Sequence, residues 1–282
     1  MRITNSNYNS ISYSQKLYFQ GIKNPKTPCL FVFDLDGTLL EGCKQDIEKV
    51  LSKSKERNAE IVFATGRSFE EFKSLRKVFD DFLPNYLVSN NGEFVYQKQA
   101  NALHKDLNYT QEFFRKMKFD KDKILKILNK MFNNNMIKIN EVAESPFVLK
   151  YHVPLTTDIK DLKSKVVQHL YDKDIKVLCE YGGENTVNQT LYLAPFCKVT
   201  GLKYLKEKLN LPSSEILIAG NDNNDISMAR LSQFGSKFIC LNNATLKLKN
   251  ICKELNCKFG NIYQSTEKGT KGILEGMEHF FE

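Results

Sequence analysis

Two carboxylates separated by one residue, Asp34 and Asp36, follow directly after the apolar run LFVF in the stretch CLFVFDLDGTLLEG. In an extended segment, residues i and i+2 point to the same side, so both side chains can face one small ligand. Close carboxylates repel each other, and both stay ionised only when a cation lies nearby. Mg²⁺ accepts one or two carboxylates together with phosphate oxygens. The pair predicts Mg²⁺-dependent phosphate chemistry, in which one carboxylate attacks phosphorus and the other moves a proton.

Four further apolar runs have the same design as LFVF and end in polar or small residues. They are EIVFA, NYLVS, EILIA and KFICL, followed by Thr65, Asn90, Gly220 and Asn242. Each run has the length and composition of a buried parallel strand, and helical patterns lie between the runs. This alternation predicts an α/β fold with a Rossmann-like parallel sheet and helices on both faces. Ligands bind beyond the carboxyl ends of such strands, so we expect the polar residues on one edge.

The middle of the chain has a different pattern and predicts a second unit. Helical patterns, an extended PFVLKYHVP, another helix and two extended segments follow one another over residues 99–190. We interpret this region as an α+β cap domain inserted into the sheet domain. The expected organisation is a polar N-terminal extension over 1–27, a core over 28–98 and 191–282, and the cap over 99–190.

Composition excludes several classes of protein. The 282-residue chain is 41% hydrophobic and 26% charged, and no apolar stretch of about 18 residues predicts a membrane span. The N-terminus lacks the apolar segment of a secretory signal. Seven scattered cysteines without a CxxC pair suit inert thiols in a reducing, cytoplasmic compartment. The net charge of +8 is spread over helical segments without a nucleic-acid-binding motif, so we expect neither nucleic acid nor a definable protein partner.

Four motifs, DLDGT, FATGRS, the lysine of APFCKVTGLKYL and AGNDNNDISM, occur in an order that resembles the haloacid-dehalogenase-like superfamily of phosphohydrolases. Within it, the chain resembles the branch with a large inserted cap, which includes Cof-type and sucrose-phosphate-phosphatase-like enzymes. The resemblance covers about residues 28–282. It implies a Mg²⁺-dependent phosphomonoester hydrolase that works through an aspartyl-phosphate. The expected substrate is a small phosphorylated metabolite, with a sugar phosphate as the first candidate.

The resemblance also assigns roles in the first two motifs. Asp34 is the expected nucleophile. Asp36 is the expected acid for the leaving group and then the base for water, and its backbone carbonyl touches the metal. Thr65 is expected to bind the transferred phosphoryl group with the backbone N–H of Gly66, and Arg67 is placed to reach the substrate. Without the other motifs, a polar turn after a strand would be the minority alternative for DLDGT, at about one chance in three.

The remaining motifs supply a cation and metal ligands. Lys198 is expected to neutralise charge on the aspartate and phosphate oxygens, and Asn91 is expected to face the substrate. The family pattern Gly-Asp-x-x-Asn-Asp is broken, because Asn221 stands where the first Asp belongs. Either the amide oxygen of Asn221 binds Mg²⁺ without a charge, or Asp222 moves inward and supplies the carboxylate. The expected metal ligands are Asp34, Asp36, Asn221, Asp222 and Asp225.

Two other functions stay open at this point. Phosphomutases and phosphotransferases share this type of core and cap and would also use an aspartyl-phosphate. The altered fourth motif also fits a catalytically weak protein of the same fold that binds phosphorylated ligands without turnover.

Overall fold

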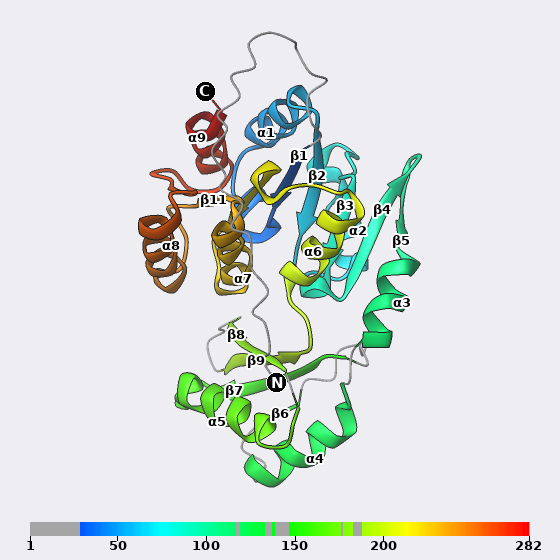
Figure 1. The fold of residues 1–282 in the computed structure, drawn as a ribbon, viewed down its shortest axis with the longest axis vertical. Coiled ribbons are helices and arrows are strands. Elements are labelled where there is room, and N and C mark those ends of the chain that lie inside the picture. The colour runs from blue at the N-terminus through cyan, green and yellow to red at the C-terminus, as the bar shows by residue number, and fades with distance from the viewer. Residues whose placement is uncertain are drawn as a thin grey trace, which may run out of the picture.

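The computed structural model describes residues 29–116, 119–132, 137–138, 147–175, 177–182 and 188–281, which form two sheets with their helices (Figure 1). The polar extension expected over 1–27 lies outside these residues. No helix within the described ranges is both long and apolar enough to cross a membrane.

The larger sheet has eight strands and is mostly parallel. Only β4 and β5 pair antiparallel, with β3 and with each other. The expected Rossmann-like α/β core is confirmed, because the predicted apolar runs form its central strands. Across the sheet lie β12 (Ile262–Gln264), β11 (Lys237–Cys240), β10 (Ile216–Gly220), β1 (Cys29–Phe33), β2 (Ala59–Ala64), β3 (Tyr86–Ser89), β4 (Phe94–Gln99) and β5 (Ala102–Lys105).

Helices cover both faces of this sheet because alternate residues of each central strand are apolar on opposite sides. In β1, Leu30 and Val32 pack toward one cluster, and Phe31 and Phe33 pack toward the other. The first cluster is closed by α6 (Lys198–Lys208), α7 (Ile226–Ala229) and α8 (Leu246–Phe259). The second is closed by α1 (Lys44–Glu56), α2 (Phe69–Ser74) and α9 (Gly269–Phe281).

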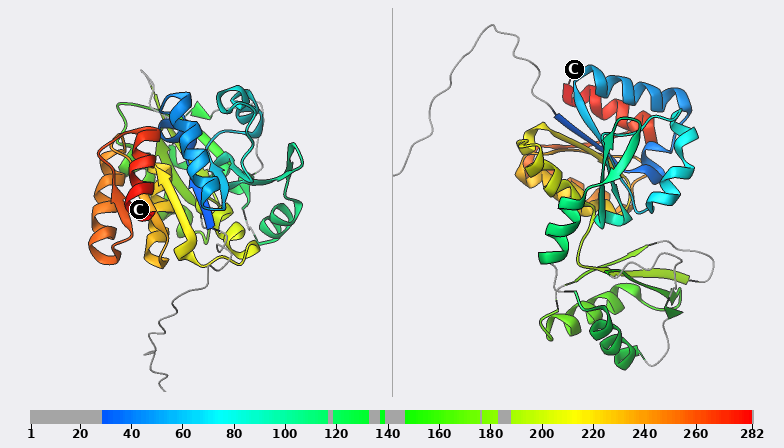
Figure 2. Two further views of the ribbon diagram at one scale, coloured as in Figure 1. Left: turned by 90° about the horizontal axis from the view of Figure 1, so that it is seen from above. Right: turned by 90° about the vertical axis from the view of Figure 1, so that its right-hand side faces the viewer.

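The second sheet is antiparallel and forms a cap below the core in Figure 1. Its strands, in spatial order, are β6 (Ile137–Lys138), β7 (Leu149–Pro154), β9 (Asn188–Ala194) and β8 (Leu178–Gly182). Helices α4 (Lys121–Phe132) and α5 (Ile159–Tyr171) pack their apolar residues on one face of this sheet. Figure 2 shows the cap as a layer separate from the core.

The two sheets divide the chain somewhat differently from the expected boundaries at 98/99 and 190/191. Strand β5 belongs to the core sheet, and β9 continues in the cap sheet to Ala194. Helix α3 (Leu107–Lys116) also lies against the core, since the Tyr109 hydroxyl donates a hydrogen bond to the Gly92 carbonyl. We therefore infer that the inserted unit begins after α3 and ends near Ala194.

Three loops at the carboxyl edge of the core sheet are joined by hydrogen bonds. The Asn243 amide donates to the Gly37 carbonyl at 2.7 Å, and the Asn242 amide donates to the Thr266 carbonyl at 2.9 Å. The loop after β12 is in turn anchored by Glu275 of α9. The Glu275 carboxylate accepts hydrogen bonds from the side chains of Tyr263, Ser265 and Thr266 and from the backbone N–H groups of Thr266 and Glu267.

This anchor gives a pH-dependent prediction. Partial burial alone would raise the pKa of Glu275, but hydrogen bonds from Ser265, Thr266 and Tyr263 lower it to about 2, from an ordinary value of 4.5. The ionised carboxylate therefore stabilises the fold above pH 4.5, and this contribution is lost as the pH falls toward 2. We expect Glu275→Gln to lower the free energy of unfolding at pH 7 by about 1–3 kcal/mol, measured by urea denaturation.

The difference between wild type and Glu275→Gln should shrink below pH 4.5, the ordinary pKa. Glu278→Gln is the matched control, because Glu278 lies on the same helix with 55% of its side chain exposed in an ion pair with Lys53. The free energy of unfolding of this control variant should fall by less than about 0.5 kcal/mol. Equal losses in the two variants would contradict the anchoring role.

Candidate active site

The ammonium group of Lys198 lies between two carboxylates and has no exposed surface. Its Nζ is 2.5 Å from Asp34 Oδ1 and 2.8 Å from Asp225 Oδ1. Asp34 follows β1, Lys198 is the first residue of α6, and Asp225 ends a helical turn after β10. Strands β1 and β10 are paired neighbours, with Phe33 opposite Ala219, so their following residues meet at the same edge.

Charge and burial act against each other in this cluster. Burial and the nearby Asp225 carboxylate raise the pKa of Asp34 to about 7, although Lys198 opposes the shift. Burial alone would lower the pKa of Lys198, but the Asp225 and Asp34 carboxylates raise it above its ordinary value. The lysine therefore stays charged, and the aspartate remains sensitive to any further cation beside it.

Asp225 is fixed by its backbone surroundings as well as by Lys198. Its Oδ2 accepts hydrogen bonds from the N–H groups of Asn221, at 2.9 Å, and Asp222, at 3.0 Å. A side chain on Gly220 would place Cβ 2.6 Å from this oxygen, so the close turn requires glycine. Asp225 thus closes the turn after β10 and holds Lys198 toward Asp34.

The second carboxylate of DLDGT, that of Asp36, pairs with Arg67. Arg67 contacts Asp36 through two nitrogens, with Nη2 2.6 Å and Nε 2.9 Å from carboxylate oxygens. About half of the Asp36 side chain is exposed, and one third of Arg67. Asp36 raises the pKa of Arg67 further, so the guanidinium is charged. The two acids of the motif therefore lie in different surroundings, one buried and one open to solvent.

The turns after β2 and β3 bring three expected substrate-facing residues together. Thr65 is fully buried, and its Oγ1 accepts a hydrogen bond from the Arg67 N–H at 3.1 Å. The Asn91 N–H donates to the Thr65 carbonyl at 3.0 Å, and Asn91 has a left-handed φ of 55°. A Cβ on Gly66 would lie 3.3 Å from Asn91 Oδ1. Asn224, in the turn after β10 and 133 positions along the chain, donates its amide to Asn91 Oδ1 at 3.4 Å.

The turn of DLDGT is joined to the turn after β10 through Asn221. The Thr38 hydroxyl donates to Asn221 Oδ1 at 3.0 Å. Gly37 has φ of +70°, and a Cβ there would lie 2.2 Å from Asn221 Nδ2. Asp222 instead caps the following turn, accepting a hydrogen bond from the Asn223 N–H at 2.6 Å.

Two contributors were not identified from the sequence. Asn243 holds the carbonyl of Gly37, and Thr245 donates its hydroxyl to Asn223 Oδ1 at 3.1 Å. Both follow β11, and the only signal for them was the position of the apolar run KFICL. Asn and Thr are common in loops, so residue type alone could not distinguish them.

The cap lies over this edge of the core. Strand β8 lies against the turn Asn223–Asp225, and the Tyr192 hydroxyl of β9 is 3.5 Å from the Asn90 carbonyl. Hydrogen bonds from Ser68 lower the pKa of Glu71 on α2, and the positive charges of Arg67 and of Lys150 on β7 lower it further. The clustered side chains thus lie between the two domains.

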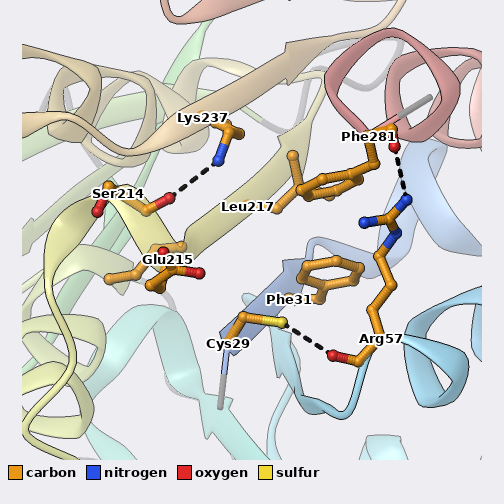
Figure 3. A pocket seen from close by; sticks show the side chains of 9 residues that line it. Cys29, Phe31, Arg57, Ser214, Glu215, Leu217, Lys237 and Phe281 are labelled. Carbon is orange, nitrogen blue, oxygen red and sulfur yellow. Dashed lines mark hydrogen bonds between the residues drawn. The ribbon is translucent and has the colours of Figure 1, made fainter. Parts of the chain in front are cut away.

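A separate cavity of about 380 Å³ lies at the opposite edge of the sheet (Figure 3). Cys29, Ile216 and Lys237 line it at the beginnings of β1, β10 and β11. Its two cations already bind carbonyl oxygens, Arg57 that of Phe281 at 2.8 Å and Lys237 that of Ser214 at 3.0 Å. We assign no catalytic role to this cavity, because none of the clustered acids reaches it.

The cluster around Lys198 gives a stability prediction. Lys198→Met removes the cation and leaves Asp34 and Asp225 buried without compensation, so the free energy of unfolding should fall by about 3–5 kcal/mol in urea denaturation. Lys203→Met, an exposed position on the same helix, should change it by less than about 0.5 kcal/mol. Adding Asp225→Asn to Lys198→Met should recover part of the loss. Equal stability of the two single variants would contradict the ion-pair arrangement.

Comparisons with known proteins identify the family of this chain and proteins with a similar fold. The sequence profile of the sucrose-6F-phosphate phosphohydrolase family matches residues 27–281. The solved structure of the sucrose-phosphatase from Synechocystis sp. PCC6803, in complex with sucrose and phosphate, superposes with a TM-score of 0.72 at 21% identity and covers 89% of this chain and 97% of that chain.

Two relatives indicate the range of chemistry around the family. A 5-amino-6-(5-phospho-D-ribitylamino)uracil phosphatase of Bacillus subtilis is 21% identical over 220 residues, 73% of this chain and 82% of the relative. A phosphomannomutase of Babesia bovis is 33% identical over 87 residues, 29% of this chain and 34% of the relative. The family match extends over nearly the whole described chain. The chain therefore belongs to the sucrose-6F-phosphate phosphohydrolase family, within the haloacid-dehalogenase-like phosphatases.

Proposed function

We propose that this phosphatase hydrolyses a small phosphorylated metabolite, with a sugar phosphate as the leading candidate, through a phosphoryl group carried on Asp34. The observation that best supports this proposal is the distance of 2.5 Å between the buried Lys198 ammonium and the Asp34 carboxylate at the end of β1. A carboxylate held there by a fixed cation is positioned without further reorganisation. The cap above it is suited to exclude bulk water from the reacting atoms.

In the first step, a carboxylate oxygen of Asp34 attacks the phosphorus of the substrate. The bond between phosphorus and the leaving oxygen breaks, and its electron pair stays on that oxygen, which takes a proton from Asp36. Lys198 offsets negative charge on the aspartate and phosphoryl oxygens. Arg67 must release Asp36, and the freed carboxylate must take up a proton from solvent, before this transfer. The anionic substrate offers the guanidinium another partner.

In the second step, water hydrolyses the aspartyl-phosphate. Asp36, now ionised, takes a proton from the water while the water oxygen bonds to phosphorus. The bond between phosphorus and the Asp34 oxygen then breaks, which restores the carboxylate and releases inorganic phosphate. The hydroxyl of Thr65 and the N–H of Gly66 are the proposed donors to the phosphoryl oxygens, and Asn91 the proposed contact for the rest of the substrate.

The residues at this edge fit Mg²⁺, because they offer the oxygen donors that this cation prefers. We propose that the Asp34 carboxylate, the Asp36 carbonyl and the Asn221 amide oxygen would hold it. The raised pKa of Asp34 supports a second cation there, since added positive charge favours the ionised nucleophile. When bound, Mg²⁺ would offset charge on the phosphoryl oxygens. Asp222 and Asp225, also expected as ligands, are less suited, because both carboxylates already bind backbone N–H groups.

The proposed substrate class rests on similarity, and the proposed cellular location of the protein rests on its sequence. The family description and the sugar-bound Synechocystis structure favour a sugar phosphate, whereas the Bacillus relative acts on a different phosphorylated metabolite. The family description, the Synechocystis structure and the Bacillus relative all agree with a small phosphorylated molecule as the substrate. The cytoplasmic location stays a prediction from cysteine usage.

The second candidate function is phosphoryl transfer within a sugar phosphate. The segment shared with the phosphomannomutase of Babesia bovis favours it, and a mutase would use the same phosphorylated aspartate. Product analysis separates the two, because hydrolysis releases inorganic phosphate and a mutase yields an isomeric sugar phosphate. A protein that only binds phosphorylated ligands would give neither product.

Phosphate release is the direct test of the proposed reaction. We expect Mg²⁺-dependent release from at least one member of a panel of sugar phosphates and from an aryl phosphate. Asp34→Asn should reduce the turnover number by more than about a thousandfold, because the nucleophile is lost. Asp80→Asn, an exposed carboxylate paired with Lys44, is the control and should retain full activity. Unchanged turnover in Asp34→Asn would exclude this nucleophile.

A second test traps the phosphorylated protein. The leaving group of an aryl phosphate needs little protonation, so the Asp36→Asn variant should still accept the phosphoryl group of this substrate on Asp34. The variant lacks the base that activates water, so the aspartyl-phosphate should not be hydrolysed. Intact-protein mass spectrometry after rapid quenching should then show an added phosphoryl group on Asp36→Asn. The Asp34→Asn/Asp36→Asn double variant should show none. Accumulation in the double variant would place the phosphoryl group on another residue.

A further inference from the structure

The carboxyl edge of the core holds fewer free negative charges than its acidic residues suggest. Within the described ranges, no three or more His, Cys, Asp or Glu side chains gather in a way that could hold a metal ion. Asp34 shares its carboxylate with Lys198 at 2.5 Å, and Asp36 shares its carboxylate with Arg67 at 2.6 Å. A cation at this edge therefore meets carboxylates that are already partly neutralised.

The acids after β10 are also occupied. Asp225 binds Lys198 with one oxygen and two backbone N–H groups with the other. Asp222 accepts the Asn223 N–H at 2.6 Å and begins the next helical turn, so an inward movement would break that cap. The side chain that faces the DLDGT turn from β10 is the uncharged Asn221.

Asn221 is fixed in this position by contacts on all sides. Its backbone N–H donates to Asp225, its carbonyl accepts from the Thr245 N–H at 2.9 Å, and its Oδ1 accepts from the Thr38 hydroxyl at 3.0 Å. A carbonyl oxygen has two lone pairs, so the contact with Thr38 leaves one for a ligand. The position thus offers a preorganised but neutral oxygen.

We propose, building on the proposed function, that this site binds Mg²⁺ weakly by itself and that the substrate phosphoryl group supplies the missing negative charge. Mg²⁺ and phosphate then bind as a cooperative pair. Mg²⁺ commonly takes one or two protein carboxylates plus substrate phosphate oxygens, and a site with one compensated carboxylate depends most on the phosphate. Linkage requires that each ligand tighten the other by the same factor.

The test measures binding rather than turnover, by isothermal titration calorimetry on the full chain. Mg²⁺ is titrated into wild type with and without saturating inorganic phosphate, and inorganic phosphate is titrated with and without Mg²⁺. We expect each ligand to tighten the other at least tenfold, by matching factors. Equal Mg²⁺ affinity in both conditions, or no Mg²⁺ binding in either, would overturn the proposal.

Two nearly isosteric variants locate the effect. Asn221→Asp keeps the acceptor for Thr38 and adds a charge, so Mg²⁺ alone should bind at least tenfold more tightly and the coupling to phosphate should weaken. Asp222→Asn should leave Mg²⁺ affinity within threefold of wild type. A tenfold loss in Asp222→Asn would assign the missing carboxylate to Asp222 and overturn the proposal, as would unchanged Mg²⁺ affinity in Asn221→Asp.

Phosphate release from the substrate panel, run on the same preparations with saturating Mg²⁺, keeps this result separate from the proposed function. Release without coupling between Mg²⁺ and inorganic phosphate overturns only the binding proposal. Coupling without release from any substrate overturns only the hydrolase mechanism.

Discussion

An ammonium group with no solvent contact is stable in a protein only when negative charge surrounds it, and Lys198 meets this condition through Asp34 and Asp225. The requirement reaches well beyond the three side chains. Strands β1 and β10 must be neighbours, the turn after β10 must be tight enough to need Gly220, and α6 must begin at the sheet edge. The same three charges hold Asp34, the proposed nucleophile, at this edge of the sheet.

Helix α6 connects this charge cluster to the region where the chain passes to the cap. Its first residue is Lys198, and its later turns carry Tyr204 and Lys208, which bind the buried Asp106 at 3.0 Å and 2.7 Å. Asp106 precedes α3 and accepts the Tyr109 N–H at 3.1 Å, as a helix cap does. One helix thus holds the lysine of the site and the chain that leads into the cap, so both are positioned by the same packing.

The loops on the other side of the site depend on α9. Glu275 fixes the loop after β12, that loop contacts the loop after β11, and Asn243 from there holds the Gly37 carbonyl. The turn that follows Asp36 is therefore supported by a carboxylate near the C-terminal end of the described chain. Such support is needed because the turn combines a left-handed glycine with close contact to Asn221.

The sequence by itself determined which segments form the central strands and where the polar residues lie. Apolar runs that stop at Asp34, Thr65, Asn90 and Gly220 predict parallel strands with polar residues at one edge. A capping box of Ser68 and Glu71 begins α2, and such a signal depends only on residues close together in the chain. The presence of a cap was readable from the change of pattern. Its limits were not, because β5 and β9 join their sheets through partners distant in sequence.

Only the tertiary structure decided which charges meet. Lys198 is one of 41 Lys and Arg residues, and Asp34 lies 164 positions away, so no local pattern could pair them. The expectation that Lys198 acts on the aspartate came from the family resemblance alone. The sequence also did not show which of the adjacent side chains of Asn221 and Asp222 faces the DLDGT turn, because that depends on the backbone conformation of the turn after β10. The turn after β10 directs Asn221 to Thr38 and Asp222 to its own backbone. Hydrophobic periodicity shows which face of a helix or strand is buried. The contacts between loops depend on how the buried helices and strands pack together, and this packing is determined by the whole chain.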